Sequence, residues 1–599
     1  MRRPARAALA ALALGALSVT GCVSMPSGGP VLSYPVTQGT AAQSQPNVQI
    51  QPQPPHPGWS PTDIVRGFLT ASANFGNYPQ VAKAYLTPDE RDWDPAWSAV
   101  VYKSGPNVAA ATYSPSAKNA TTAFVKVTGS IQATLQGNGS YSVPSASASG
   151  GSPHMPSAFK LTKVGGQWRI ASAPLELLLS SNSFANDYQL SNLYFFDPLT
   201  KFLVPDPVYV PVISTHALLG GLVNELISPP TDWLSFGATK TAFPPKTKVS
   251  DVTLDGVTAV VSLTGAAIGK AGTDVMEQVS AQLLSTLSDA ATSGSAGQGV
   301  QSVEVVVNGH PWYPPATPGN PVQRTPQWNP ADGSSDRFYS VDSKGNLTSR
   351  TAPGSKPVTV ARIGTGYSQI AVSADERYLA ALHGSTLYTG TLGGPLTKRG
   401  TGFVAMSWDA SDNLWASQND QIVEFRGTPN PRQPLAQTVQ VNVSGGPGGP
   451  YTELAVAPDG VRVAIVSGGN QLVFGAIAQQ PGQNPVITLS PVQQAPLTQV
   501  QSAPAQANFT ALSWYGPDNV IALATPGPSV TEYPVSGAAP TSIQADSNMT
   551  TITASLGQPL IAGLQNGHML FDVNVTGSWM RVNNSDDTPA DGSSPVYSG

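Results

Sequence analysis

The hydrophobic positions of this chain change their spacing three times along the sequence. A continuous apolar run over residues 7–19 comes first, and it is about half as long as a membrane-spanning helix. Residues 23–57 follow with no apolar period, and they are rich in Pro, Gln, Ser and Gly. Ser60 begins a part with helical and strand spacings, and from about residue 320 a repeated strand pattern replaces the helical period. The pattern therefore predicts a leader, a tether, a mixed helix-and-strand part and an all-β part.

The first ordered part, residues 59–185, is predicted to be a small α+β domain. Ser60 is a suitable N-cap and Pro61 suits the first helical turn. Apolar residues four positions apart, such as Ile64 and Phe68, then indicate a helix. A second short helical piece is expected over residues 81–86, and strands are expected over 123–128, 130–135 and 159–170.

Residues 190–315 are predicted to form a second α+β domain. Two apolar stretches flank Asp197-Pro198 and indicate a hairpin. A helix capped by Ser214 or Thr215 should follow and end at Pro229-Pro230. The remaining expected elements are a hairpin at Asp255-Gly256, a helix from about 274 to 294 and a strand over 303–307.

Residues 320–599 are predicted to form a β-propeller of five or six blades. The repeat consists of an apolar strand, a turn with Asp or Gly and a second apolar strand, and its clearest copy begins at Leu454. Further copies begin 36 to 58 residues apart, a spacing typical of four-stranded blades with variable loops. Residues 337–350 should supply part of one more blade, completed by the C-terminal residues. A pair of β-sandwiches is the alternative, although it explains the repeated Asp turn less well.

The N-terminal segment, residues 1–21, is interpreted as a secretory signal peptide. Three arginines lie among its first six residues, and the apolar run ends in Val19-Thr20-Gly21-Cys22. This ending resembles a bacterial lipobox, which implies cleavage between Gly21 and Cys22 and lipid addition to Cys22. Cys22 is the only cysteine of 599 residues, so it cannot form an intramolecular disulfide. The alternative is a free or buried thiol at this position.

Residues 22–58 are interpreted as the lipid anchor and a Pro/Gln-rich tether. Prolines near residues 52–57 favour an extended spacer, and a Pro-rich ligand for a small recognition domain is the alternative. Loss of residues 1–21 leaves 27 basic against 35 acidic side chains. This acidic balance, without a Lys/Arg cluster, does not suit nucleic-acid binding. No later apolar run reaches a membrane span, so we expect an anchored protein that does not cross the membrane.

The sequence shows no recognisable catalytic, cofactor-binding or metal-binding set. None of the six histidines has a second ligand at metal spacing, and there is no G-x-S-x-G elbow or phosphate loop. Asp375, Asp459 and Asp518 are interpreted as turn residues. An acidic cluster near Trp93 and Trp97 is either a cation or partner site or a solvated loop, and it consists of Asp89, Glu90, Asp92 and Asp94.

The order of these parts resembles the actinobacterial LpqB lipoprotein family, with a GerMN-like domain over 190–315. The segments that carry the resemblance are 21–27, 68–72, 85–87, 194–197, 203–206, 218–219, 243–244 and 261–263. The resemblance implies a lipidated protein on the extracytoplasmic face of the cell membrane. It also implies a partner, the extracytoplasmic sensor domain of the histidine kinase MtrB, in a system that governs cell-wall metabolism and division. Of the family's functional residues only Cys22 carries over.

The leading hypothesis is a non-enzymatic, membrane-anchored accessory protein of a two-component sensor kinase. One rival is a lipoprotein that binds cell-wall glycan or peptidoglycan through Trp408, Trp415 and Trp514, although their repeated strand positions favour packing inside the blades. The second rival is a propeller hydrolase with an acidic residue in its central channel.

Overall fold

The computed structural model describes most of the chain from Pro52 to Gly599. The segments outside the described residues are 1–51, 77, 96, 115, 117–118, 145–156, 213, 294–298, 313–327, 329, 332–334, 427–434, 436, 447, 480–482 and 497–507. The predicted signal peptide, the cleavage pair Gly21 and Cys22, and most of the predicted tether therefore lie outside the described residues.

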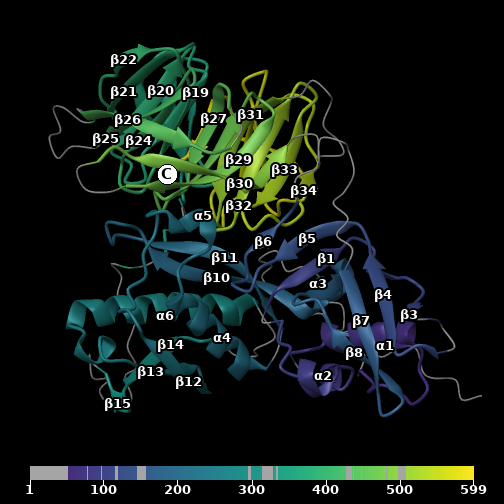
Figure 1. The fold of residues 1–599 in the computed structure, drawn as a ribbon. Coiled ribbons are helices and arrows are strands. Elements are labelled where there is room, and N and C mark those ends of the chain that lie inside the picture. Colours follow the sequence, from purple (N-terminus) through teal and green to yellow (C-terminus); the bar gives the residue numbers. More distant parts are fainter. Residues whose placement is uncertain are drawn as a thin grey trace, which may run out of the picture. The chain divides into compact units, whose positions relative to one another are not determined.

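The first domain packs helix α1 (Pro61–Ala73) against two sheets, as the helical and strand spacings predict (Figure 1). The Ser60 hydroxyl caps α1 by accepting from the Asp63 amide at 3.2 Å. The side chains of Ile64 and Phe68 are buried in the core of the domain. Its other helical elements are α2 (Pro79–Lys83), η1 (Pro88–Glu90) and α3 (Ser181–Asp187).

The strands of this domain form two sheets, and both sheets contribute side chains to one apolar core. One has the order β6-β5-β1-β9, and the other has β2-β4-β7-β8 with β3 beside β4. The strands are β1 (Ala99–Tyr102), β2 (Asn107–Val108), β3 (Thr112–Ser114), β4 (Thr122–Thr128), β5 (Ile131–Leu135), β6 (Tyr141–Ser142), β7 (Ser157–Val164), β8 (Gln167–Ser172) and β9 (Leu177–Ser180).

The last seven residues of the predicted tether contact this domain. The Tyr85 hydroxyl donates to the carbonyl of Gln53 at 2.6 Å, and the amide of Gly58 donates to the side-chain oxygen of Gln167 at 2.7 Å. Pro52 is buried. Residues 52–58 are therefore held against the first domain, which shortens the segment that can serve as a free spacer.

The second α+β domain begins with the predicted hairpin, now formed by β10 (Tyr188–Phe196) and β11 (Leu203–Pro211). Helix α4 (Thr215–Ile227) follows with Ser214 as its N-cap, as predicted, and buries the expected leucine and valine stripe. Helix α6 (Thr273–Ser293) connects β13 to a parallel β14. The other elements are α5 (Asp232–Ser235), η3 (Ile268–Lys270), β12 (Lys248–Asp255), β13 (Thr258–Thr264), β14 (Ser302–Val307) and β15 (His310–Pro311).

The remaining strands form six four-stranded blades. Blade 1 consists of β39 (Ser593–Tyr597), β16 (Phe338–Val341), β17 (Asn346–Arg350) and β18 (Val358–Arg362). Blade 2 consists of β19 (Gln369–Val372), β20 (Tyr378–His383), β21 (Thr386–Thr391) and β22 (Thr397–Thr401), and blade 3 of β23 (Phe403–Trp408), β24 (Leu414–Gln418), β25 (Gln421–Arg426) and β26 (Gln437–Ser444).

Blades 4 to 6 complete the ring. Blade 4 consists of β27 (Tyr451–Val456), β28 (Arg462–Ser467), β29 (Gln471–Ala478) and β30 (Val486–Pro496). Blade 5 consists of β31 (Asn508–Tyr515), β32 (Asn519–Thr525), β33 (Ser529–Pro534) and β34 (Thr541–Ile543), and blade 6 of β35 (Met549–Thr553), β36 (Leu560–Leu564), β37 (Met569–Asp572) and β38 (Met580–Arg581).

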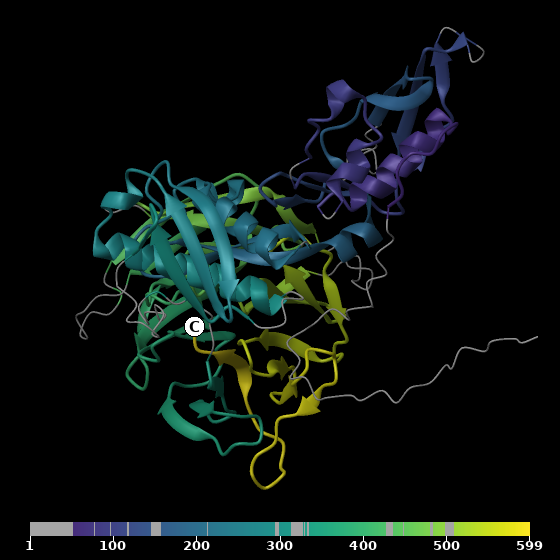
Figure 2. The same ribbon diagram turned by 90° about the horizontal axis from the view of Figure 1, so that it is seen from below.

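The ring closes because the last strand of the chain completes the first blade. Strand β39 pairs antiparallel with β16, and the end of the chain lies within the propeller (Figures 1 and 2). The six inner strands contact one another in the cyclic order β39, β19, β23, β27, β31 and β35, with β35 returning to β39. This closed order confirms the predicted propeller, fixes the blade number at six, and excludes the β-sandwich pair.

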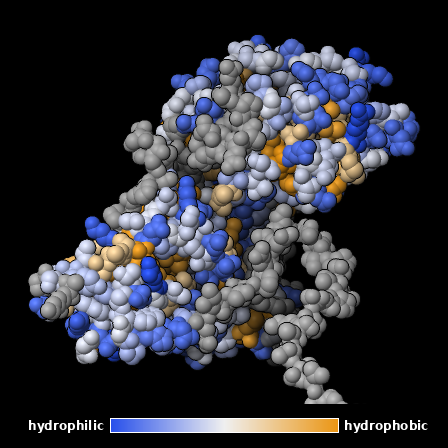
Figure 3. Space-filling model, turned by 90° about the vertical axis from the view of Figure 1, so that its right-hand side faces the viewer, coloured by the Kyte–Doolittle hydropathy of each residue, from blue (hydrophilic) through white to orange (hydrophobic). Residues whose placement is uncertain are grey.

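The surface of the described part is mostly polar on the face that Figure 3 shows, with smaller apolar areas between polar residues. The aromatic residues of the repeats are not among the exposed ones. Trp408 and Trp415 are fully buried and Trp514 is 8% exposed. Packing inside the propeller, rather than stacking on a ligand, therefore accounts for these three tryptophans.

Candidate functional site

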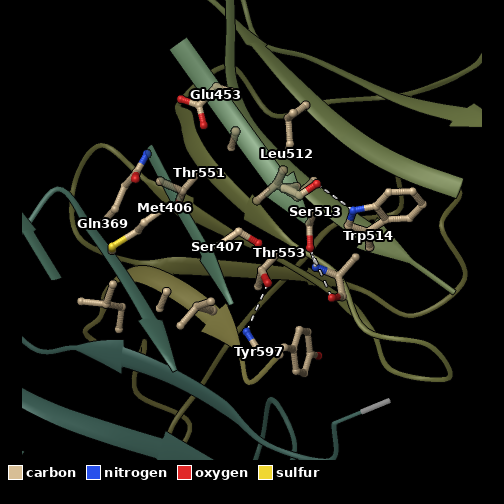
Figure 4. Close-up of a pocket in the computed structure, with 18 of the residues that line it drawn as sticks. Gln369, Met406, Ser407, Glu453, Leu512, Ser513, Trp514, Thr551, Thr553 and Tyr597 are labelled. Carbon is tan, nitrogen blue, oxygen red and sulfur yellow. Dashed lines mark hydrogen bonds between the residues drawn. The ribbon is translucent and has the colours of Figure 1, made fainter. Parts of the chain in front are cut away.

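The inner strands of all six blades line a central cavity of about 150 Å³. A propeller presents its inner strands to this space because each blade radiates outward from the axis. Figure 4 shows side chains of several blades around the same cavity. The cavity is therefore the one place where residues from every repeat come together.

Hydroxyl groups on the cavity wall join neighbouring blades. In each case a side-chain oxygen on one inner strand accepts from a backbone amide at the next blade. The bonds join Ser407 to Val456 (3.0 Å), Ser513 to Ala554 (2.9 Å) and Thr553 to Tyr597 (3.2 Å). These hydroxyls already have partners within the protein, so they serve the closure of the ring.

Glu453 is the carboxylate side chain of the cavity wall. It lies on β27, immediately before the buried Leu454 with which the clearest repeat begins. Burial raises the pKa of Glu453 well above its usual range. Among the described residues its carboxyl has no hydrogen-bond or ion-pair partner, and Gln369 and Met406 line the same cavity (Figure 4).

The described part of the cavity does not present the arrangement of a glycoside hydrolase. That chemistry uses two carboxyl groups on opposite sides of the scissile bond, and the described lining contains a single carboxylate side chain, Glu453. Within the described ranges, no group of three His, Cys, Asp or Glu residues is placed to hold a metal ion.

Several buried polar groups gather where the hairpin β10–β11 meets the propeller. Val204 of the hairpin and Leu234 of α5 belong to one buried apolar cluster with Phe474, Phe509 and Tyr533 of blades 4 and 5. The hairpin is itself shaped by Asp197, whose carboxylate accepts from three backbone amides of its turn. These donors are Leu199 at 2.9 Å, Lys201 at 2.5 Å and Phe202 at 2.7 Å.

Asp206 is the fully buried carboxylate of this contact. It accepts from the amide of Thr231 at 2.7 Å and from the Thr231 hydroxyl at 2.5 Å. Desolvation raises the pKa of Asp206 to about 6, although these hydrogen bonds and the positive charge of Arg462 oppose the shift. The two aspartates Asp197 and Asp206, which lie in the segments that carry the family resemblance, therefore hold the hairpin and its neighbour α5 in place.

Asn192 bridges two further acids across the contact. Its side-chain amide donates to Asp518 of blade 5 at 2.8 Å, and its backbone amide donates to Asp289 of α6 at 3.0 Å. Burial raises the pKa of Asp289 to about 6, and the nearby negative charge of Asp518 adds to the shift. Burial also raises the pKa of Asp518. Asp518 is thus more than the turn residue that the sequence predicts.

Asp459 combines its predicted turn role with a buried ion pair. Its carboxylate accepts from the backbone amides of Val461 and Arg462 and pairs with the Arg462 guanidinium at 2.7 Å. The guanidinium lies 5.1 Å from the ring centre of Trp514. Asp375 likewise accepts from the Arg377 amide in a turn, and there the accompanying ion pair is exposed on the Arg side.

The predicted acidic cluster is split between several structural roles. The Glu90 carboxylate accepts from the Ala173 amide at 3.3 Å, and Trp93 is buried with its indole N–H donating to the carbonyl of Pro174 at 2.6 Å. Asp89 and Asp92 are exposed on the surface. A cavity of about 270 Å³ brings together Asp94 and Trp97 with Phe75, Asp187 and Tyr188.

Sequence reasoning missed Glu453, Asp187 and Asp289, which are half-buried acids whose pKa is raised by burial. The signal for Glu453 was present, because a charged residue at the start of an inner strand is unusual in an otherwise apolar repeat. The signal for Asp187 and Asp289 was not, because each becomes buried through contacts with segments distant in sequence.

The described fold and cavity define a six-bladed β-propeller protein that also carries two small α+β domains. Three family models match the chain in this order: the N-terminal domain of lipoprotein LpqB over 54–185, the sporulation and spore germination domain Germane over 192–312, and the LpqB β-propeller domain over 345–597. Among the helices of the described residues, none is both long and apolar enough to cross a bilayer.

Relatives of known name agree with these models. A lipoprotein LpqB of Thermobifida fusca is 28% identical over 99% of both chains, and one of Streptomyces coelicolor is 28% identical over 86% of this chain and 85% of its own. Among solved structures, the β-propeller domain of Cps50 (Swd1) from Myceliophteria thermophila is 16% identical to this chain. The match covers 35% of this chain and 65% of that domain, with a TM-score of 0.25. The chain belongs to the LpqB lipoprotein family.

Proposed function

We propose that this lipoprotein is a non-enzymatic accessory protein of a two-component sensor kinase. Lipid on Cys22 would anchor it to the extracytoplasmic face of the cell membrane, where it would contact the extracytoplasmic sensor domain of an MtrB-like histidine kinase. The output would be an influence on cell-wall metabolism and cell division. Family membership, together with the resemblance stated above, supplies the partner class.

The groups on the propeller's inner surface give the best support for an interaction role. The wall hydroxyls are engaged between blades, and the described lining has one carboxylate side chain where hydrolysis would need two. Binding surfaces of propellers lie on their loops and short strand edges. Anchoring both proteins in one membrane would raise their effective concentration, so that a moderate contact suffices.

The glycan-binding rival loses its main support. It relied on stacking of sugars on Trp408, Trp415 and Trp514, and these side chains are buried in the propeller. Glycan binding would therefore need other, exposed aromatic side chains on which the sugars could stack.

The test is site-specific photo-crosslinking in native membranes. A photoreactive residue is placed at exposed propeller positions, Val358 and Val573, and at an exposed position of the first domain, Leu175. We expect a sensor kinase to be captured from a propeller position and not from Leu175. A truncation near residue 315 is a poor substitute, because it would expose Val204 and Leu234, which the propeller covers.

Two results would contradict the proposal. Capture of the kinase from Leu175 alone would move the partner surface to the first domain, and capture of glycan without any kinase would favour the cell-wall rival. The Cys22→Ala variant is the matched control, since loss of the anchor should abolish capture from every position.

A further inference from the structure

The central cavity contains a group that the proposed function does not use, the carboxyl of Glu453. Its side chain reaches the cavity from blade 4, while Gln369 and Met406 reach it from blades 2 and 3 (Figure 4). Glu453 is half-buried, and the described residues provide its carboxyl with neither a donor nor a counter-charge. A carboxyl group that lines a cavity without a protein partner is available to a bound cation, and a cationic ligand would supply both.

The other groups of the cavity wall restrict the charge of that ligand. No Lys, Arg or His lies among the described lining residues, so an anion would find no counter-charge. The Tyr597 hydroxyl donates to the carbonyl of Pro559 at 2.8 Å, and Glu453 is the charged side chain of the described lining. The wall is therefore neutral or negative.

We propose that this cavity binds a primary ammonium group carried on a short aliphatic stem, with Glu453 as its counter-charge. An ammonium group has three donors and no acceptor, which suits the Glu453 carboxylate and the side-chain oxygen of Gln369. The flexible thioether of Met406 suits the stem. A volume of about 150 Å³ would hold on the order of ten water molecules, so a ligand of similar size fits. This inference goes beyond the proposed function and does not depend on it.

Binding should be linked to proton release from Glu453. Burial raises the pKa of the Glu453 carboxyl well above its usual range. An ammonium group requires the carboxylate. The affinity should therefore rise with pH until the ligand amine itself loses its proton, at about pH 10.4 for a lysine side chain.

The experiment is isothermal titration calorimetry on the full-length lipoprotein in detergent. The probe is Nα-acetyl-lysine amide, and the uncharged comparison is Nα-acetyl-norleucine amide, which has a similar aliphatic stem. Titrations at pH 7 and pH 8.5, in two buffers of different ionisation enthalpy, count the protons released. We expect binding of the lysine amide alone, accompanied by proton release, and tighter binding at pH 8.5.

The Glu453→Gln variant should bind the lysine amide roughly 10- to 100-fold more weakly, because it loses one charge-assisted interaction. Glu532→Gln, at a half-buried carboxyl of β33 outside the cavity lining, is the matched control and should bind as the wild type does.

Several outcomes would overturn the inference. They are the absence of binding to wild type, equal binding of the norleucine amide, and unchanged affinity of the Glu453→Gln variant. If that variant fails to fold, equal binding of the lysine and norleucine amides by the wild type is decisive on its own. Each of these results leaves the crosslinking test of the kinase partner unaffected.

Discussion

The substitution Asp206→Ala tests most directly whether this buried carboxylate holds the hairpin and α5 in place at the propeller. Asp206 is fully buried, with an exposed fraction of 0%, and it accepts from the amide and the hydroxyl of Thr231. The alanine variant leaves the amide and the hydroxyl of Thr231 without this acceptor. It also removes a carboxylate whose burial is costly when it is ionised.

The expected loss of stability depends on pH. A buried donor without a partner costs about 1–3 kcal/mol, and removal of the buried charge offsets part of two such losses, so we expect a net loss of about 2 kcal/mol at pH 7.5. The folded-state pKa of Asp206 is about 6, above its ordinary value of 3.8. Protonation therefore stabilises the folded wild type as the pH falls through 6, and linkage gives on the order of 1 kcal/mol between pH 7.5 and pH 5. The alanine variant lacks this gain, so its deficit should grow to roughly 3 kcal/mol at pH 5.

Hydrogen exchange at the Leu234 amide measures this deficit locally. Leu234 is buried at the contact, and its amide donates to the carbonyl of Thr231 at 3.0 Å. A loss of 2 kcal/mol corresponds to roughly 30-fold faster opening, and the further loss at pH 5 speeds opening several-fold more. Asp232→Ala, at the exposed neighbouring aspartate, is the control and should change the opening free energy by less than about 0.5 kcal/mol. Equal protection of Leu234 in the Asp206→Ala variant and the wild type at both pH values would refute the reasoning.

Two other substitutions test separate parts of the protein. Cys22→Ala should move the protein from the membrane fraction to the soluble fraction or leave its signal uncleaved, and a variant that stays processed and anchored would contradict the lipobox interpretation. Arg462→Met should lower the free energy of unfolding by about 3–5 kcal/mol, because it leaves Asp459 buried without its partner. Arg377→Met, which breaks an exposed ion pair with Asp375, should change the stability far less than Arg462→Met does, because solvent screens the exposed pair. Thermal unfolding of the Arg462→Met and Arg377→Met variants measures this difference. Equal shifts in Tm would contradict the idea that burial determines how much an ion pair contributes to stability.

Local sequence signals were sufficient to predict the order of elements. Ser60 and Ser214 cap helices because a hydroxyl before an apolar stripe satisfies the first free amides. The repeat of strand, Asp turn and strand predicted the propeller, because each blade is built from contacts close in sequence. The blade number stayed open between five and six, because the first blade needs β39, which comes from the opposite end of the chain.

The candidate site was harder to predict, because its properties arise from contacts distant in sequence. Glu453 acquires its environment from five other blades, and Asp289 acquires its environment from the hairpin and from blade 5. Trp408 illustrates the opposite case. Its repeated strand position already favoured blade packing over sugar stacking, and its complete burial agrees.

The acids at the hairpin–propeller contact make the docking geometry specific, and they do not make the docking stronger. An apolar contact of the same shape would hold as well or better, because burying charged groups costs more than their pairing usually returns. Desolvation raises the pKa values of Asp206, Asp289 and Asp518, which means that the ionised forms oppose docking at neutral pH. Each acid nevertheless has a donor in only one geometry, such as the Asn192 side chain for Asp518. Among these bonds, the one from Asn192 to Asp518 crosses from the hairpin to the propeller. A hairpin shifted by one residue would leave the Asp518 carboxylate without this donor, so the bond penalises other registers of hairpin and propeller.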